Sequence, residues 1–407
     1  MLDTLAVSDR RSGRRGGPSG AGGAAAIALA LAVLVSLGAG APALAVSPEV
    51  SSGVRRGIDR LLNVEPDQAE AEARAIQQMA GGEAAGAFLA AFAPVARLGE
   101  TEETGAQLDQ FLEALKPIVA LVEALEAERP RDAEVKLLAG TVWGAKAMAD
   151  GARHNVLAAY RGIKEAHRAF SEALALQPGL YDAHYGLGLY EISVAQLPRL
   201  LRGAVAWVLP PGDLERGLDR LRMAAERGTL LRPLAQMALF TVLVNGQQRY
   251  AEAAALGQAL LDRYPNNPAL YFPLALSYSE TGQHGEALKV ARQLWARLEA
   301  GAPPFRREML PRYHQLMGKL YMDMGEHATA LRFFQRAIDH GNTAYAWVTA
   351  WAWTRSGMIH DLAGDRAEAV RRYRKALEVE AESLAKEVAE EYLATPYTRN
   401  GPRPRRR

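Results

Sequence analysis

From residue 234 onward, large apolar, small and polar residues recur in one register in four units, two consecutive units of 34 residues and two more after short insertions. The first unit spans residues 234–267 and the second 268–301, and two more begin at Pro311 and near Ala350. Within each unit, two stretches of about 12 to 14 residues carry apolar residues at i, i+3, i+4 and i+7, the spacing of an amphipathic helix. Each unit is therefore predicted to be a pair of antiparallel helices.

Small residues mark where the two helices of a pair must approach closely. They recur at the same two positions of the units: Ala275 and Ala287, Gly318 and Ala330, and Gly357 and Ala369. One pair cannot bury its own apolar face, so about three or more must stack on one another. We predict an all-α fold, a right-handed superhelical solenoid of antiparallel helix pairs without β-sheet. Substantial strand content in far-ultraviolet circular dichroism would contradict this prediction.

This register resembles the tetratricopeptide repeat. The second unit shows it well, with Tyr271 near the start, Ala275 and Ala287 at the small positions, and Tyr278 between them; the first unit ends with Pro265 at the proline position. The resemblance implies four such repeats over residues 234–383. It also implies binding of a peptide or protein partner in a concave groove rather than catalysis.

The remaining chain is predicted to extend this solenoid. Residues 61–150 read as helical hairpins at its N-terminal end, and residues 151–233 as irregular repeats with an apolar insertion at 203–213. The irregular part weakly resembles a bacterial tetratricopeptide group that is distantly similar to the inclusion-body-clearance repeat proteins. Residues 46–60 are expected to be a flexible start of the mature chain. Residues 384–407 are expected to hold the end of the terminal helix and a basic disordered tail.

The apolar insertion carries Val205, Trp207 and Leu209, and such long loops are uncommon unless they have a use. These side chains either pack against the solenoid or stay exposed as a contact for a partner or membrane. Burying each contributes roughly 1.5–3 kcal/mol, which favours packing. Trp207→Ala is then expected to lower the free energy of unfolding by about 3 kcal/mol or more in a urea titration. An unchanged melting temperature with lost partner or membrane association would instead make the insertion a binding element.

The N-terminus has the pattern of an export signal. Four arginines precede an apolar core of residues 24–39, and the triplet Ala43, Leu44 and Ala45 fits the small-x-small cleavage rule. Residues 1–45 are thus predicted to be a signal peptide, with the exported chain starting at Val46 in the periplasm or outside the cell. Sixteen apolar residues are fewer than the roughly 20 of a stable membrane span. An uncleaved anchor in the inner membrane is the alternative.

Charge and cysteine content limit the classes of partner and chemistry that this chain can have. Removing four arginines and two acidic residues with the signal leaves 44 basic and 44 acidic residues, so no basic face for nucleic acid is indicated. The chain has no cysteine, which excludes disulfides, thiol catalysis and lipidation on cysteine. Five arginines follow residue 393, and they are expected to be solvated. Membrane association is expected only through an uncleaved signal, the insertion or this tail.

No catalytic, metal or cofactor motif is present in the sequence. The eight histidines occur in no metal-ligand spacing, and neither a Gly-x-Ser-x-Gly elbow nor a phosphate-binding loop occurs. Gly186-Leu187-Gly188 lacks the third glycine of a dinucleotide fingerprint and indicates close helix packing. We therefore predict a protein that is not an enzyme and has no cofactor.

The groove is expected to be lined by the first helix of each pair. Its predicted partner-binding residues are Phe272, Leu276, Arg312, Gln315, Lys319, Trp351 and Arg355, with Thr354 and Asp361 on the same face. Arg312 and Lys319 lie two helical turns apart, and together they would hold a carboxylate or a peptide backbone. Ordinary surface charges are the alternative for these two. The family's usual carboxylate clamp, lysine followed four residues later by asparagine, occurs nowhere in the chain.

The leading functional hypothesis is an exported, non-enzymatic scaffold or adaptor with a peptide or protein partner. The alternative is an accessory subunit of an envelope assembly, secretion or polymer-export machine. An enzyme hidden in residues 181–213 is disfavoured, because that segment has no pair of nucleophile and base.

Overall fold

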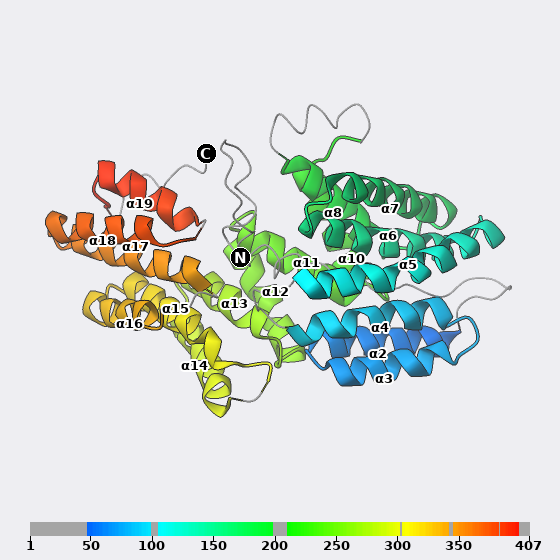
Figure 1. Cartoon of the computed structure of the whole chain (residues 1–407), viewed down its shortest axis with the longest axis horizontal. Helices are drawn as coiled ribbons and strands as arrows, with labels where there is room; N and C mark the ends of the chain where they lie inside the picture. The colour runs from blue at the N-terminus through cyan, green and yellow to red at the C-terminus, as the bar shows by residue number, and fades with distance from the viewer. Residues whose placement is uncertain are drawn as a thin grey trace. The chain divides into compact units, whose positions relative to one another are not determined.

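The computed structural model describes residues 47–98, 105–197, 210–301, 303–341, 345–381 and 383–398. In these ranges it holds 17 α-helices and a short 3-10 helix but no strand, which confirms the all-α prediction (Figure 1). The chain divides between Val242 and Leu243 into two compact units, here called the N-terminal and the C-terminal unit, and each is described by itself. No helix of the described ranges is long and apolar enough to cross a membrane.

The N-terminal unit is built of helical hairpins. Its helices are α2 (Pro48–Leu62), α3 (Pro66–Gln77), α4 (Glu83–Leu98), α5 (Gly105–Glu128), α6 (Ala133–Ala152), α7 (Val156–Leu176), α8 (Ala183–Ala195), α10 (Leu214–Arg227) and most of α11 (Arg232–Asn245). Consecutive helices from α2 to α8 pack against one another, and α8 pairs with α10. The predicted insertion residues Val205, Trp207 and Leu209 and the predicted signal peptide lie outside the described residues.

Residues 48–60 correct the prediction of a flexible start, because they form most of α2. Val50, Val54 and Ile58 recur at intervals of four residues and are fully buried. Ser47 caps the helix by accepting a hydrogen bond from the backbone N–H of Val50 at 3.2 Å. The apolar spacing of this segment is typical of a helix and was sufficient to predict one.

Glycines let α6, α7 and α8 pack closely around one aromatic ring. A Cβ added at Gly186 of α8 would lie 1.9 Å from the ring of Phe170, and one added at Gly140 of α6 would lie 2.8 Å from it. Phe170 itself, on α7, is only 3% exposed. The Gly186-Leu187-Gly188 motif is therefore a helix-packing motif here, as the sequence indicated.

A buried carboxylate holds the start of α11. Asp182, 2% exposed, accepts hydrogen bonds from the backbone N–H groups of Thr229, Leu230 and Leu231 at 2.7–3.1 Å. It also accepts one from the Thr229 hydroxyl at 3.0 Å. These N–H groups belong to the bend just before α11, which begins at Arg232, and buried backbone N–H groups outside a helix need an acceptor from another segment. Asp182 thereby ties the segment before α8 to the segment before α11.

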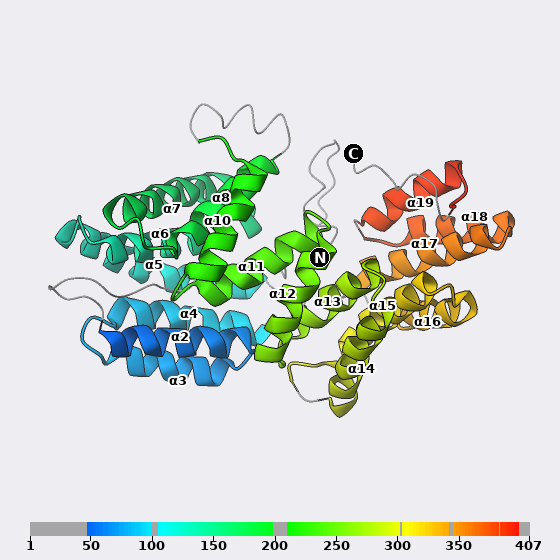
Figure 2. The same ribbon diagram turned by 180° about the vertical axis from the view of Figure 1, so that it is seen from behind.

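The C-terminal unit contains helix pairs in the predicted register. Its helices are α12 (Tyr250–Arg263), α13 (Pro268–Glu280), α14 (His284–Ala300), α15 (Leu310–Asp323), α16 (His327–Asp339), α17 (Ala346–Leu362), α18 (Arg366–Glu378) and α19 (Leu384–Ala394), with a 3-10 turn at Arg307–Met309. The first helices α13, α15 and α17 contact one another in sequence, and α17 contacts α19 (Figure 2). The boundary between the units falls within α11, so the predicted repeat 234–267 contributes one helix to each unit.

The small positions of the repeats work as expected. Gly318 and Gly357 lie against the rings of Phe334 and Tyr373, where an added Cβ would come within 2.4 and 2.6 Å of a ring atom. Both rings are fully buried. A larger residue at either glycine would push the second helix of the pair away from the first.

Candidate functional site

A cavity of about 320 Å³ opens on the side of the C-terminal unit that is formed by the first helix of each pair. We call it the groove cavity. Its wall is formed mainly by α13, α15, α17 and α19, the helices that follow one another along the unit (Figure 1). Of the predicted groove residues, Lys319, Trp351 and Arg355 line it. The cavity thus lies where the repeat pattern placed the partner-binding surface.

Lys319 is held by two carboxylates in this wall. Its Nζ donates to Glu280 of α13 at 2.9 Å and to Asp323, one turn further along α15. Asp323 also accepts from the hydroxyl of Ser279 at 2.6 Å. The lysine charge is therefore neutralised by its own wall, and it links α13 to α15 rather than facing the cavity as an open anion site.

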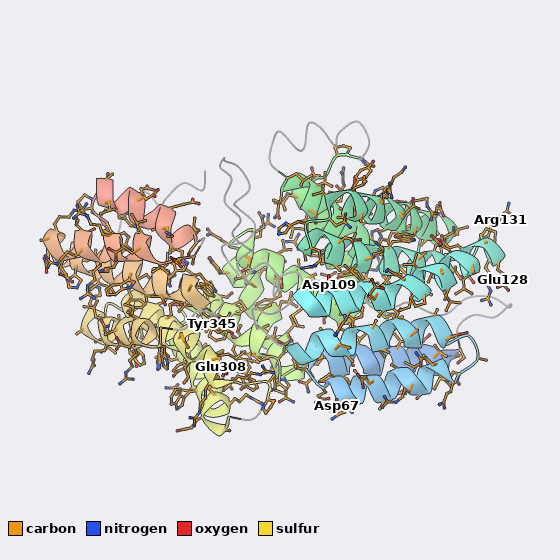
Figure 3. All side chains as sticks on the ribbon, in the orientation of Figure 1. Asp67, Asp109, Glu128, Arg131, Glu308 and Tyr345 are labelled. Atoms are coloured by element: carbon orange, nitrogen blue, oxygen red, sulfur yellow. The ribbon has the colours of Figure 1, made fainter. Side chains whose placement is uncertain are left out.

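Arg312 lies elsewhere, buried among aromatic rings. Its guanidinium carbon is 4.1 Å from the ring centre of Phe272 and 5.5 Å from that of Tyr345, which precedes α17 and is labelled in Figure 3. The ring of Trp347 is 5.7 Å away. Burial lowers the pKa of Arg312 below its ordinary value, while Tyr345 opposes that shift. Arg312 is 8% exposed and does not line the groove cavity, so the predicted clamp of Arg312 with Lys319 is not assembled.

The remaining predicted positions divide between wall and core. The guanidinium of Arg355 stacks 4.5 Å above the ring of Trp351, and both side chains line the cavity. Leu276 and Gln315 are half-buried and lie outside its lining, and Phe272 is covered by Arg312.

Two positions placed in the groove by the repeat register are structural instead. Thr354 is fully buried and donates to the carbonyl of Ala385 in α19 at 3.0 Å. Asp361 pairs with Arg366 at 3.0 Å and accepts from the backbone N–H of Tyr397 at 2.8 Å. Thr354 is covered by α19, and Asp361 by Arg366 and the segment after α19; the repeat pattern alone does not place either segment.

Sequence reasoning missed the contribution of α19. Glu387 and Glu391 of this helix line the groove cavity, and neither is among the predicted groove residues. The signal was the apolar spacing of Ala385, Val388 and Tyr392, which makes this short helix amphipathic and able to cover the last pair.

A second, apolar cavity of about 200 Å³ lies in the N-terminal unit between α6, α7 and α8. Glycines and alanines leave this space, and its aromatic walls include Phe170, Tyr185 and Tyr190. The hydroxyl of Tyr190 donates to the carbonyl of Pro210 at 2.6 Å. Among the described residues, no group of histidine, aspartate and glutamate side chains could hold a metal ion.

A buried histidine makes stability depend on pH. Burial, together with nearby His340 and Arg336, lowers the pKa of His314 from 6.5 to about 4. Between pH 6.5 and 4 the unfolded chain binds a proton that the folded chain does not, so stability falls as the pH falls through this window. The urea midpoint is expected to drop between pH 7 and 5, and to drop less in His314→Phe. Equal drops in the two proteins would contradict this assignment.

Comparison with known proteins finds a family model that matches part of the C-terminal unit. Residues 312–380 match the family model described as tetratricopeptide repeat. The match covers α15 to α18 and confirms the resemblance seen in the third and fourth units. No curated protein matches the chain.

Several solved structures are similar to this chain at low identity. PilW, a widely conserved type IV pilus biogenesis factor, is 15% identical with a TM-score of 0.35, over 57% of this chain and 92% of that one. The human IFIT1 dimer with m7Gppp-AAAA is 14% identical with a TM-score of 0.42, over 89% of each chain. Yeast Tom70 is 11% identical with a TM-score of 0.41, over 86% of this chain and 82% of that one.

Proposed function

We propose that this chain is a non-enzymatic scaffold whose tetratricopeptide repeats bind a peptide or protein partner in the groove cavity. The observation that carries the proposal is the position of this cavity. The first helices α13, α15 and α17 of three pairs, together with α19, supply its wall, and that wall combines aromatic, methionine and charged side chains. A surface of this kind presents apolar anchors within a polar frame, as recognition sites for extended peptides do.

Trp351 is the expected anchor of this site. Tryptophan often dominates binding energy where it lies at the centre of an interface, and Trp351 lines the cavity with Arg355 stacked on its ring. Trp351→Ala is expected to weaken partner capture by about tenfold or more, measured by pull-down from an envelope fraction with quantitative mass spectrometry.

The matched control is Trp295→Ala, which removes a partly exposed tryptophan of α14 outside the cavity. Melting temperatures of both variants are recorded, so that lost folding is not taken for lost binding. The proposal fails if both variants capture the same partners in the same amounts as the unaltered protein.

We also propose that the scaffold works outside the cytoplasm. The support is the sequence of residues 1–45, with its arginines, short apolar core and Ala43-Leu44-Ala45 triplet. The intact mass of the protein purified from the envelope fraction is expected to correspond to a chain starting at Val46 or within a few residues of it. A mass that retains residues 1–45 would favour an N-terminal anchor.

A further inference from the structure

The sign of the charge in the groove cavity is opposite to the one that the sequence suggested. Four carboxylates line it, from Glu280, Asp323, Glu387 and Glu391, against two basic side chains. One of the basic side chains, Lys319, is bound by Glu280 and Asp323. The wall therefore carries a net negative charge, and it disfavours the carboxylate ligand for which Arg312 and Lys319 had been candidates.

Two of these carboxylates remain available to a ligand. Glu387 and Glu391 stand one helical turn apart on α19, so both project from one side of that helix. Both are exposed, and within the described part of the chain their carboxylates make no ion pair or side-chain hydrogen bond. Two adjacent carboxylates repel each other, and a cation placed between them would relieve that repulsion.

Apolar side chains lie beside the carboxylates. Val388 and Leu384 share the inner face of α19, and Met322 and Met358 reach the same cavity from α15 and α17. Arginine and lysine combine a charged end with an apolar stem, so a wall that offers carboxylates next to methylene and thioether groups fits both parts. Arg355, which stacks on Trp351, shows such an arrangement within the chain itself.

We propose that the groove cavity selects a cationic peptide segment, with an arginine or lysine side chain directed at Glu387 and Glu391 and a neighbouring apolar side chain against Met322 and Met358. This inference rests on the proposed function, because it names the partner class of the same cavity. Arginine fits best, since its planar guanidinium donates to two carboxylate oxygens at once.

The test uses fluorescein-labelled hexapeptides of alternating arginine and leucine, with glutamine–leucine and glutamate–leucine counterparts. Anisotropy titrations with the full-length protein are expected to show tightest binding of the arginine peptide, weakening as salt is added. Glu387→Gln combined with Glu391→Gln is expected to weaken it by about tenfold, the effect of losing charged hydrogen bonds. Glu390→Gln removes one carboxylate charge from the same helix outside the cavity and is expected to leave binding unchanged.

The outcomes separate this inference from the function on which it rests. Equal weakening by Glu390→Gln and by the double variant, or equal binding of all three peptides, would overturn the cationic preference. If the glutamine peptide binds as tightly and Trp351→Ala abolishes its binding, the groove still binds peptides and only the charge preference is wrong. If no peptide binds and Trp351→Ala leaves partner capture unchanged, the proposed function itself fails.

Discussion

Replacing Asp182 with alanine is expected to lower the free energy of unfolding of the N-terminal unit by roughly 3–5 kcal/mol, since three backbone N–H groups lose a charged acceptor. The N–H groups of Leu230 and Leu231 are buried, so water does not readily replace the carboxylate. The urea midpoint followed by far-ultraviolet circular dichroism measures the effect.

Two further variants test whether the buried acceptor is the cause. Asp182→Asn keeps one acceptor oxygen and is expected to lose less stability than the alanine variant. Asp219→Ala removes an exposed aspartate of α10 that pairs with Arg222 at 2.9 Å, and such a surface pair contributes about 0–1 kcal/mol. Similar losses in Asp182→Ala and Asp219→Ala would show that Asp182 does not anchor α11.

The second large effect is expected at Gly186. Gly186→Ala places a methyl group 1.9 Å from the ring of Phe170, which also lies against Gly140 of α6, so the ring must be displaced from its packed position. Overpacking of this kind costs about 1–3 kcal/mol, and the melting temperature of the N-terminal unit should fall accordingly.

The matched control is Gly144→Ala in α6, where the nearest atom to the new methyl group would be Ala166 Cβ at 3.9 Å. This change is expected to raise stability by up to about 1 kcal/mol through helix propensity. Adding Phe170→Leu to Gly186→Ala should recover part of the loss, because the smaller side chain leaves room for the methyl group. A stable Gly186→Ala variant would contradict the close packing of α8 on α7.

The groove could be predicted in part. The register named Lys319, Trp351 and Arg355, and all three line the groove cavity. It also named Arg312, Thr354 and Asp361, whose burial follows from contacts with Phe272, α19 and Tyr397. A repeat register assigns a residue to a helix face, but it does not say whether another element covers that face.

The charge of the site depended on pairing between distant residues. Lys319 and Glu280 are 39 positions apart, so no local pattern shows that the lysine is neutralised. Glu387 and Glu391 reach the cavity because α19 packs on α17 and α18. Only the folded chain brings the carboxylates and the methionines to one cavity.

The amino-acid sequence by itself determined the helix pairs, their period and their close contacts at Gly318 and Gly357. These features follow from local apolar periodicity and from the absence of a side chain at glycine, which any short window of sequence displays. The tertiary structure alone decided which charges face the cavity, how α19 ends the stack and where Asp182 finds its partners. Those features depend on contacts between segments far apart in the chain. Such contacts form cooperatively when the chain folds, and no local periodicity of the sequence shows them.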